Sequence, residues 1–300
     1  MTTAFVSAAT VDEVLAALAG GARPVAGGTD LVVGARQGKA PLPDSIVAIH
    51  RLDDLRGLGA VHGRLRLGAL VTHAEIAGDP VVLERLTALA DASAIVGSHA
   101  TRAHGTIGGN LMNASPAMET GGPLMVFAAT ATLRSEAGER QVPVAELMTG
   151  PGSTSAAPGE LLTAVDVPLP EDGTGSAYVR LEYRRQMEIA VVGATAAVRL
   201  AGGAVDRAGV AITALAPTIR LVPEAAAALA GTDAGPEAVR AAAAAAAASA
   251  EPISDVRASA DYRRAMAEVV ARRALTAAVA RARGEAVQVP ASSAVFGGVA

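Results

Sequence analysis

Apolar positions in the first half of the chain follow helical and strand spacing in turn. Thr10 and Glu13 form a capping box, which predicts a short helix through Leu18 that ends at two glycines. Short apolar runs at 23–26 and 45–49 predict buried strands. Further strands are predicted at 64–67, 130–134, 140–144 and 161–167, and helices at 81–90 and 123–129. We expect a loop rich in Gly, His and Asn between these helices, as far as Asn113.

A linker divides the second half of the chain from the first. Residues 168–176 contain four Gly or Pro residues and predict a domain boundary. Strands are predicted after it at 178–183, 189–200 and 210–215, and Ala-rich helices at 223–230, 236–250 and 261–283. Strands followed by helices are typical of an α+β domain. The tail after Gly284 is predicted to be mobile.

Composition limits the chemistry of the chain. Apolar residues make up 51% of it but aromatic residues only 2%, so the core must consist mainly of small aliphatic side chains. The absence of cysteine excludes disulfides, a thiolate nucleophile, Cys-ligated zinc and a Cys-ligated iron–sulfur cluster. The five histidines show no metal-binding spacing, so we expect no metal site.

Charge and hydropathy narrow the class of protein further. The net charge is −4 and no basic block is present, which argues against a nucleic-acid surface. The mean hydropathy of +0.37 reflects alanine, and no run approaches the ~20 apolar residues of a membrane span. No secretory signal is visible at the N-terminus. We therefore expect a cytoplasmic protein without a transmembrane segment.

Two glycine-rich segments are the candidates for a ligand-binding site. One runs from Val25 to Leu31 and the other from Gly105 to Leu111. Paired glycines let the backbone approach an anion and direct N–H groups at it without lysine, of which the chain has one. A single Gly-Gly pair is more simply a turn, and six such pairs occur. Neither segment fits the dinucleotide fingerprint GxGxxG or the P-loop.

Together, Ala26-Gly-Gly-Thr-Asp30 and Thr106-Ile-Gly-Gly-Asn110 resemble the paired FAD-binding signatures of one flavoprotein family. This family is the FAD-binding (medium) subunit of xanthine dehydrogenase and carbon monoxide dehydrogenase, the molybdenum hydroxylases. The segments 104–116, 149–152 and 184–192 are also similar to it, in the same order. The similarity extends over nearly all of the first 285 residues.

The resemblance implies an α+β fold with two domains. Residues 1–172 would form a bipartite FAD-binding domain of the vanillyl-alcohol-oxidase (PCMH) type. Residues 177–285 would form a smaller C-terminal α+β domain, with an antiparallel sheet and helices, and residues 286–300 the mobile tail. The boundary agrees with the linker found from composition.

The resemblance also implies the residues that bind FAD, and none that is catalytic. The first segment would hold the diphosphate and ribityl through its backbone, and the second would form a further cradle. Asn113 and Glu119 would bond the ribose or adenine side, Leu162 would pack near the cofactor, and Arg180 would stand beside the flavin, where the family often has lysine. The implied set is Val25, Ala26, Gly27, Gly28, Thr29, Asp30, Leu31, Gly105, Thr106, Gly108, Gly109, Asn110, Asn113, Glu119, Leu162 and Arg180.

The implied function is electron transfer within a complex. A molybdopterin-binding large subunit would oxidise the substrate, and a small subunit with two [2Fe–2S] clusters would pass electrons to this chain's FAD and on to a terminal acceptor. A dimer of heterotrimers is expected. Two alternatives stay open: a flavin-free assembly subunit of the same complex, and a stand-alone flavin reductase of the same fold. Arg184 and Arg185 are interpreted as ion-pair partners on a strand, or alternatively as the rim of the acceptor site.

Overall fold

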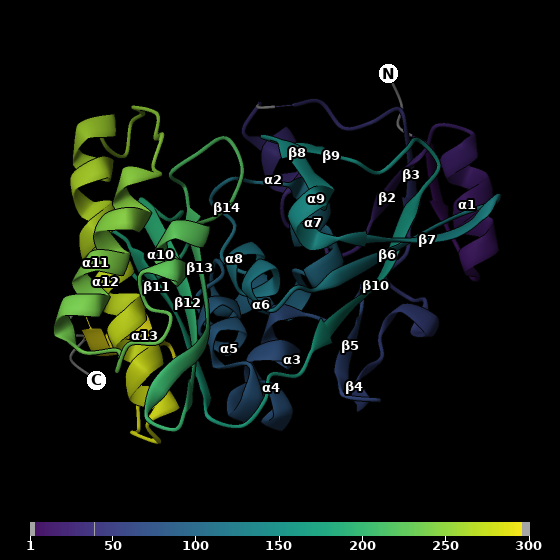
Figure 1. Ribbon diagram of the computed structural model, residues 1–300. Helices are drawn as coiled ribbons and strands as arrows, with labels where there is room; N and C mark the ends of the chain where they lie inside the picture. Colours follow the sequence, from purple (N-terminus) through teal and green to yellow (C-terminus); the bar gives the residue numbers. More distant parts are fainter. Residues whose placement is uncertain (1–3, 39, 296–300) are drawn as a thin grey trace.

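The structure is a computed structural model that describes residues 4–38 and 40–295. Its elements form layers that can be followed across Figure 1 from the N-terminal half, right, to the C-terminal half, left. A small parallel sheet and a five-stranded antiparallel sheet build the N-terminal half, and short helices fill the middle. A four-stranded antiparallel sheet then carries the last helices on its outer face. The α+β fold is therefore confirmed.

The first sheet is parallel, with the strand order β1-β3-β2. It is accompanied by two helices, and the elements are β1 (Ala4–Ser7), α1 (Val11–Ala19), β2 (Arg23–Val25), α2 (Leu31–Arg36) and β3 (Ser45–Ala48). The Thr10 hydroxyl accepts the Glu13 N–H at 3.2 Å, as predicted, whereas the Glu13 carboxylate accepts the N–H of Ala9 at 2.8 Å. The sequence pattern does not predict α2, because none of its side chains is buried.

The second sheet is antiparallel, with the strand order β4-β5-β10-β6-β7. Its elements are β4 (Leu58–Val61), β5 (Arg64–Gly68), β6 (Thr130–Ser135), β7 (Gly138–Pro143) and β10 (Leu161–Pro168). A 3-10 turn, η1 (Asp53–Leu55), precedes the sheet, and a small hairpin of β8 (Met148–Gly150) and β9 (Ser153–Thr154) precedes β10. The four strands predicted in this region are confirmed. Because β10 is the central strand, its apolar side chains lie in the core.

Short helices lie between this sheet and the C-terminal half. They are α3 (His73–Gly78), α4 (Pro80–Arg85), α5 (Thr87–Ala94), α6 (His99–His104), α7 (Ile107–Asn113), α8 (Gly121–Val126) and α9 (Val144–Leu147). The single helix predicted at 81–90 is wrong, because Leu86 leaves helical geometry and separates α4 from α5. The predicted loop up to Asn113 is also wrong. Ser98 and Thr106 cap α6 and α7 there, and the glycine content hides their helical spacing.

The C-terminal half is one antiparallel sheet covered by helices. Its elements are β11 (Thr174–Leu181), β12 (Val192–Ala201), β13 (Ala204–Thr213), β14 (Arg220–Leu221), α10 (Pro223–Ala227), α11 (Pro236–Ala248), α12 (Ala260–Ala282) and α13 (Ala291–Val295). The three Ala-rich helices are confirmed. Both β11 and β13 begin earlier than predicted. β11 starts inside the expected linker, so only residues 169–173 connect the two halves.

The two faces of this sheet differ in polarity. The outer face presents Ala and Val side chains to α11 and α12, where small residues allow close packing. The inner face carries Tyr178, Arg180 and Thr195, all 0% exposed, toward α5 and α8. The join between the halves is therefore a layer of buried polar groups.

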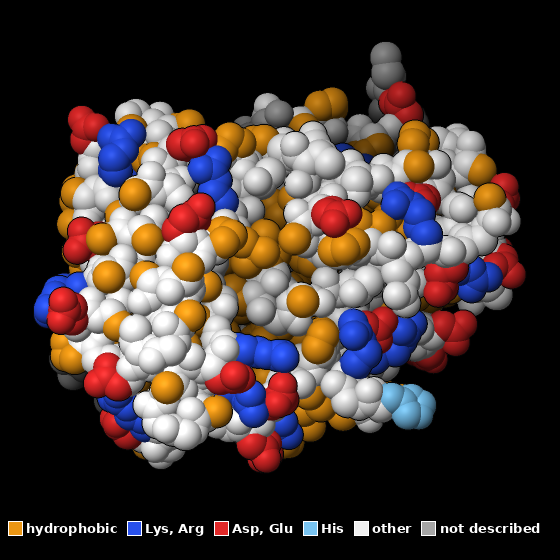
Figure 2. All heavy atoms as spheres, in the orientation of Figure 1, with side chains coloured by type: hydrophobic (Ala, Val, Ile, Leu, Met, Phe, Trp, Pro, Cys, Tyr) orange, Lys and Arg blue, Asp and Glu red, His pale blue; other side chains and the backbone are white. Residues whose placement is uncertain are grey.

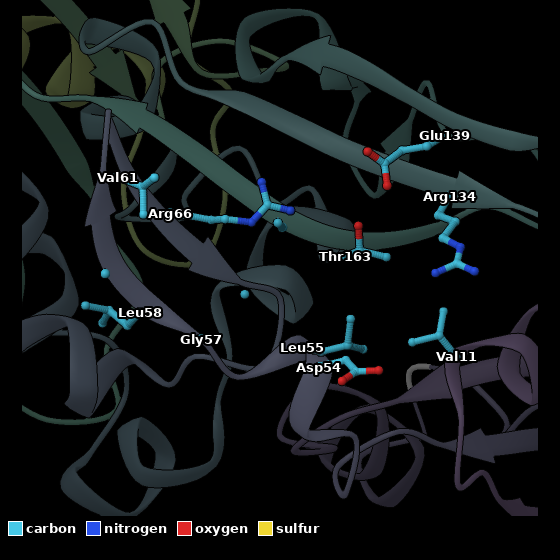
Figure 3. A pocket seen from close by; sticks show the side chains of 13 residues that line it. Val11, Asp54, Leu55, Gly57, Leu58, Val61, Arg66, Arg134, Glu139 and Thr163 are labelled. Carbon is cyan, nitrogen blue, oxygen red and sulfur yellow. The ribbon is translucent and has the colours of Figure 1, made fainter. Parts of the chain in front are cut away.

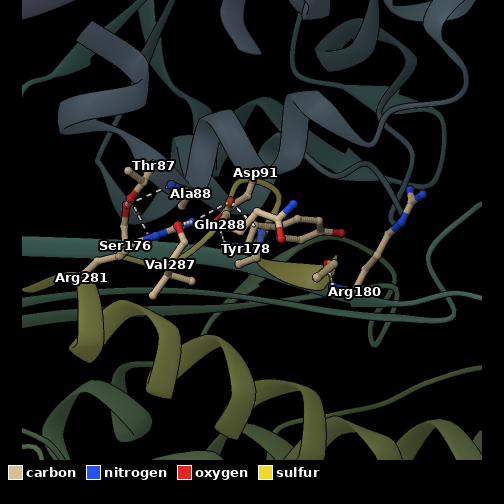
Figure 4. A network of polar contacts seen from close by, with 11 residues as sticks. Thr87, Ala88, Asp91, Ser176, Tyr178, Arg180, Arg281, Val287 and Gln288 are labelled. Carbon is tan, nitrogen blue, oxygen red and sulfur yellow. Dashed lines mark hydrogen bonds and ion pairs between the residues drawn. The ribbon is translucent and has the colours of Figure 1, made fainter. Parts of the chain in front are cut away.

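Asp91, on α5, is the centre of one such polar cluster (Figure 4). Its fully buried carboxylate accepts two hydrogen bonds from Arg281, at 2.6 and 3.0 Å, and one each from the N–H groups of Tyr178 and Ala291. Residues 291–295 form α13 and pack on β11, so a mobile tail from residue 286 is wrong for this stretch. The hydrogen bond from the Ala291 N–H to Asp91 holds α13 in place. The rest of the predicted tail, 296–300, lies outside the described residues.

Within residues 4–38 and 40–295, every helix is too short or too polar to cross a lipid bilayer.

Candidate functional site

The first glycine segment joins a strand to a helix. β2 ends at Val25, residues 26–30 form the turn, and α2 begins at Leu31. Gly28 has a φ of +67°, a left-handed conformation that favours glycine. Among the described residues, none accepts a hydrogen bond from the N–H of Gly27, Gly28 or Thr29. These three successive N–H groups are the arrangement that binds anionic oxygens.

The second glycine segment differs from the predicted loop, because most of it is the helix α7. The Thr106 hydroxyl caps this helix by accepting the Gly109 N–H at 3.1 Å. The N–H groups of Ile107, Gly108 and Asn110 bond to carbonyl oxygens of Val71, Ala69 and Thr106. What the segment presents outward is therefore the bare backbone of Gly109, which is exposed, rather than unused N–H groups.

Gly108 and Asn110 fasten this helix to its surroundings. A Cβ on Gly108 would lie 2.7 Å from the carbonyl oxygen of Ala69, so glycine is required for the approach of α7 to the end of β5. The Asn110 side-chain oxygen accepts the Thr120 hydroxyl hydrogen at 2.6 Å. Both residues hold α7 in place from within the protein.

The two glycine segments meet, although about 80 residues separate them in sequence. A Cβ on Gly27 would lie 1.9 Å from the carbonyl oxygen of His104, which directly precedes the second segment. A Cβ on Gly105 would lie 3.5 Å from the Thr29 hydroxyl. The structure therefore brings the two predicted segments into one site, with Gly27 and Gly109 exposed on it.

Sequence reasoning missed His73, whose ring lies at this junction. The backbone N–H of His73 donates to the Gly105 carbonyl at 3.1 Å, and its ring carbon Cδ2 would be 3.4 Å from a Cβ on Gly105. The residue is 1% exposed, and burial, reinforced by the cation of Arg102, lowers the pKa of the imidazole to about 4. The only sequence signal nearby is the capping box of Thr72 and Glu75, which predicts a helix start rather than a site.

Glu119 and Arg180 lie beside one another in the interior. Arg180 is 0% exposed, forms an ion pair with Glu119, and forms a second with Glu182. Burial raises the pKa of the Glu119 carboxyl, although the Arg180 cation acts in the opposite direction. The sequence prediction gave each residue its own contact with the cofactor. The structure also pairs them with each other, so the charge of Arg180 is offset by its carboxylate partners.

Leu162 and Asn113 occupy more peripheral positions. Leu162 is 3% exposed in β10, in the core that supports the N-terminal half, and Asn113 is half-buried at the end of α7. Arg184 was expected to lie on a strand, but it does not, because β11 ends at Leu181. It does have an ion-pair partner, since its Nε lies 3.4 Å from Glu188.

One cavity lies apart from the glycine segments (Figure 3). It measures about 430 Å³ between α1 and the five-stranded sheet. Arg66 and Arg134 line it, but their charges are matched by Asp166 and Asp12 at 2.8 Å. A hollow of another kind appears in Figure 2, between β14 and α7 in the orientation of Figure 1, where hydrophobic side chains gather. Within the described residues, no group of three His, Asp or Glu could hold a metal ion.

The hydrogen-bond donors of the glycine segments match the acceptors that FAD offers. Three N–H groups of the first segment have no acceptor among the described residues, and a diphosphate offers the oxygens they need. The exposed backbones of Gly27 and Gly109 leave room for close approach. The two segments together thus form a backbone surface that an anionic cofactor can approach closely.

Comparison with known proteins gives the same picture. Residues 1–170 match the model of the FAD binding domain in molybdopterin dehydrogenase, and residues 177–278 match that of the CO dehydrogenase flavoprotein C-terminal domain. The carbon monoxide dehydrogenase medium chain of Afipia carboxidovorans is 32% identical over 87% of this chain and 90% of its own. A putative xanthine dehydrogenase FAD-binding subunit of Escherichia coli is 29% identical over 88% and 91%.

A solved structure extends the similarity to three dimensions. It is the carbon monoxide dehydrogenase from Hydrogenophaga pseudoflava which lacks the Mo-pyranopterin moiety of the molybdenum cofactor. The TM-score is 0.90 at 32% identity, and the match covers 94% of this chain and 98% of the other.

Proposed function

The chain belongs to the FAD-binding medium-subunit family of the molybdenum hydroxylases, and we propose that it relays electrons from a partner's iron–sulfur clusters to a terminal acceptor. It is an oxidoreductase subunit whose cofactor is FAD. The observation that carries the proposal is the junction of Gly27 with His104, which unites both glycine segments in a chain of this family.

The proposed complex contains two further kinds of subunit. A large subunit binds molybdopterin and oxidises the substrate, and a small subunit holds two [2Fe–2S] clusters. With no cysteine, this chain cannot ligate such clusters through thiolates, so its electrons come from another chain. Relatives are named as medium chains or FAD-binding subunits, which supports this division. The proposed assembly is a dimer of heterotrimers that works in the cytoplasm.

The residues of this chain bind and orient the cofactor. FAD, when bound, accepts and releases electrons one or two at a time. The N–H groups of Gly27, Gly28 and Thr29 bind its diphosphate, and Gly109 leaves space for it along α7. Thr106 and Asn110 keep α7 rigid through their bonds to Gly109 and Thr120. No side chain acts as a nucleophile.

The proposal is tested by isolating the complex through a tag on this chain. We expect three subunits in equal amounts, with one FAD and four iron atoms per copy of the chain. Mixing the oxidised complex with the substrate of its large subunit should bleach the flavin absorbance near 450 nm. A reconstituted complex without the small subunit should lose this bleaching but retain FAD.

Two outcomes contradict the proposal. A complex that contains this chain but no flavin, even after incubation with FAD, indicates an assembly subunit. A single chain that turns over a small molecule without partners indicates a free-standing flavin reductase.

A further inference from the structure

Arg102 differs from the other buried arginines in its lack of a carboxylate partner. Arg180 pairs with Glu119 and Glu182, and Arg263 with Asp255. Arg102 is also buried, at 7% exposed, but no carboxylate of the described residues lies within 4.0 Å of its guanidinium. Its recorded side-chain hydrogen bond goes from Nη1 to the Val96 carbonyl at 3.0 Å.

The surroundings of Arg102 add to its positive charge. Burial, and then the cation of Arg180, lower the pKa of Arg102. The Arg102 cation itself contributes to lowering the pKa of His73, which is therefore neutral and offers no counter-charge. The carbonyl ends of the short helix α6 compensate only partly, because a helix terminus carries about half an elementary charge. An unpaired buried cation is costly, so an anion is expected at this position.

The position of Arg102 indicates which anion this is. It lies in the last turn of α6, three residues before Gly105, and His73 connects it to the junction where Gly105 meets Thr29. Its Nε and Nη2 atoms are not fully buried, so both keep some contact with the surface. We infer that Arg102 is a cofactor-binding residue that pairs with an anionic group of FAD, either the diphosphate or the flavin ring once reduced. Of the proposed function, this inference requires only that the chain binds FAD.

This assignment changes the electrostatics expected from the sequence. Arg180 was the expected source of positive charge beside the flavin, but its ion pairs with Glu119 and Glu182 offset that charge. Arg102 has no such compensation among the described residues. The net positive charge of the site therefore comes from α6, on the N-terminal side of the second glycine segment.

The test replaces Arg102 by Gln in the full chain and measures dissociation constants for FAD and for riboflavin, which lacks phosphate. If Arg102 pairs with the diphosphate, the constant for FAD should rise about tenfold or more, while that for riboflavin stays within about twofold. If it pairs with the reduced ring, the constant for oxidised FAD should stay within about twofold. Binding of reduced FAD should then weaken about tenfold, which lowers the two-electron midpoint potential by about 30 mV.

Two further variants separate charge from structural support. Arg102→Lys retains the cation, so it should restore most of what Gln loses, and it also serves if the Gln variant does not fold. Arg64→Gln is the matched control, because Arg64 also bonds a backbone carbonyl, that of Asp166, without a carboxylate partner in the described structure. It should change neither constant. Equal weakening of FAD and riboflavin, no change in any quantity, or a Lys variant as impaired as Gln would overturn the inference.

Discussion

The backbone of Gly27 lies directly against that of His104, so that a Cβ on Gly27 would come within 1.9 Å of the His104 carbonyl oxygen. This contact joins the turn after β2 to the end of α6. It changes the reason for the glycine. From sequence, Gly27 is required so that the cofactor can approach, whereas in the structure it is required so that the two cofactor-binding segments can approach each other.

Gly27→Ala should therefore separate the two segments. The new methyl group cannot be accommodated by rotating a side chain, because the atom it meets belongs to the backbone. We expect FAD to bind at least tenfold more weakly, measured by titration of flavin fluorescence. Gly34→Ala is the control, since a Cβ there, in α2, meets nothing within 4 Å and should leave binding unchanged. Wild-type affinity in the Gly27 variant would show that the junction does not matter for the cofactor.

Gly109→Ala should separate cofactor binding from folding. Gly109 is exposed on α7, and an added Cβ would meet only the Thr106 hydroxyl, at 3.1 Å. The change should therefore alter the free energy of unfolding by less than about 1 kcal/mol. The methyl group would occupy the surface proposed for FAD, so we expect affinity to fall. Denaturant unfolding and FAD titration measure the two effects, and an unchanged dissociation constant would contradict the placement of FAD on α7.

His73 should make stability depend on pH. Its pKa is about 4 in the folded protein but about 6.5 when unfolded, so between these values the unfolded chain binds a proton that the folded chain does not. The free energy of unfolding should therefore fall as pH is lowered through this range, by about 2 kcal/mol between pH 6.5 and 5. His73→Gln should remove this pH-dependent contribution to the free energy of unfolding. Urea unfolding at both pH values, with FAD saturating, compares the variant with wild type, and equal slopes would refute the prediction.

The Asp91–Arg281 pair should be among the most sensitive contacts in the molecule. Asp91→Asn leaves the buried Arg281 guanidinium without a charged partner, which should cost about 3–5 kcal/mol of unfolding free energy. Asp12→Asn is the matched control: Asp12 bonds Arg134 at 2.8 Å but its side chain is 81% exposed, so the cost should stay below about 1 kcal/mol. Similar losses in both variants, by urea denaturation, would contradict the importance of burial.

Sequence patterns predict the fold where apolar spacing or composition is regular. The strands β5, β6, β7 and β10 and the Ala-rich helices α11 and α12 follow from apolar spacing and from helix propensity. The helices α2, α6 and α7 do not, because they span only six or seven residues; side-chain caps hold α6 and α7, and α2 buries no side chain. The ordered position of α13 depends on Asp91, far away in sequence, and no local pattern reveals it.

The candidate site was predictable in its segments but not in its contacts. Paired glycines next to Thr29 and Thr106 are visible in the sequence, and the structure brings them together. The pairing of Glu119 with Arg180 and the burial of His73 depend on how α3, α6 and β11 pack, which no spacing rule expresses. Arg102 becomes notable only when its missing counter-charge can be seen in three dimensions.

The buried carboxylate of Asp91 also sets an order of events during synthesis. Its partners Arg281 and Ala291 lie 190 and 200 residues later in the chain, so α5 is synthesised long before they exist. Because domains fold from the N-terminus as the chain emerges, α5 must wait with an unsatisfied charge while the C-terminal sheet is made. Closure of the two halves around Asp91 therefore cannot precede the synthesis of Arg281 and Ala291, so the last contacts of α5 to be completed are those with the end of α12 and the start of α13.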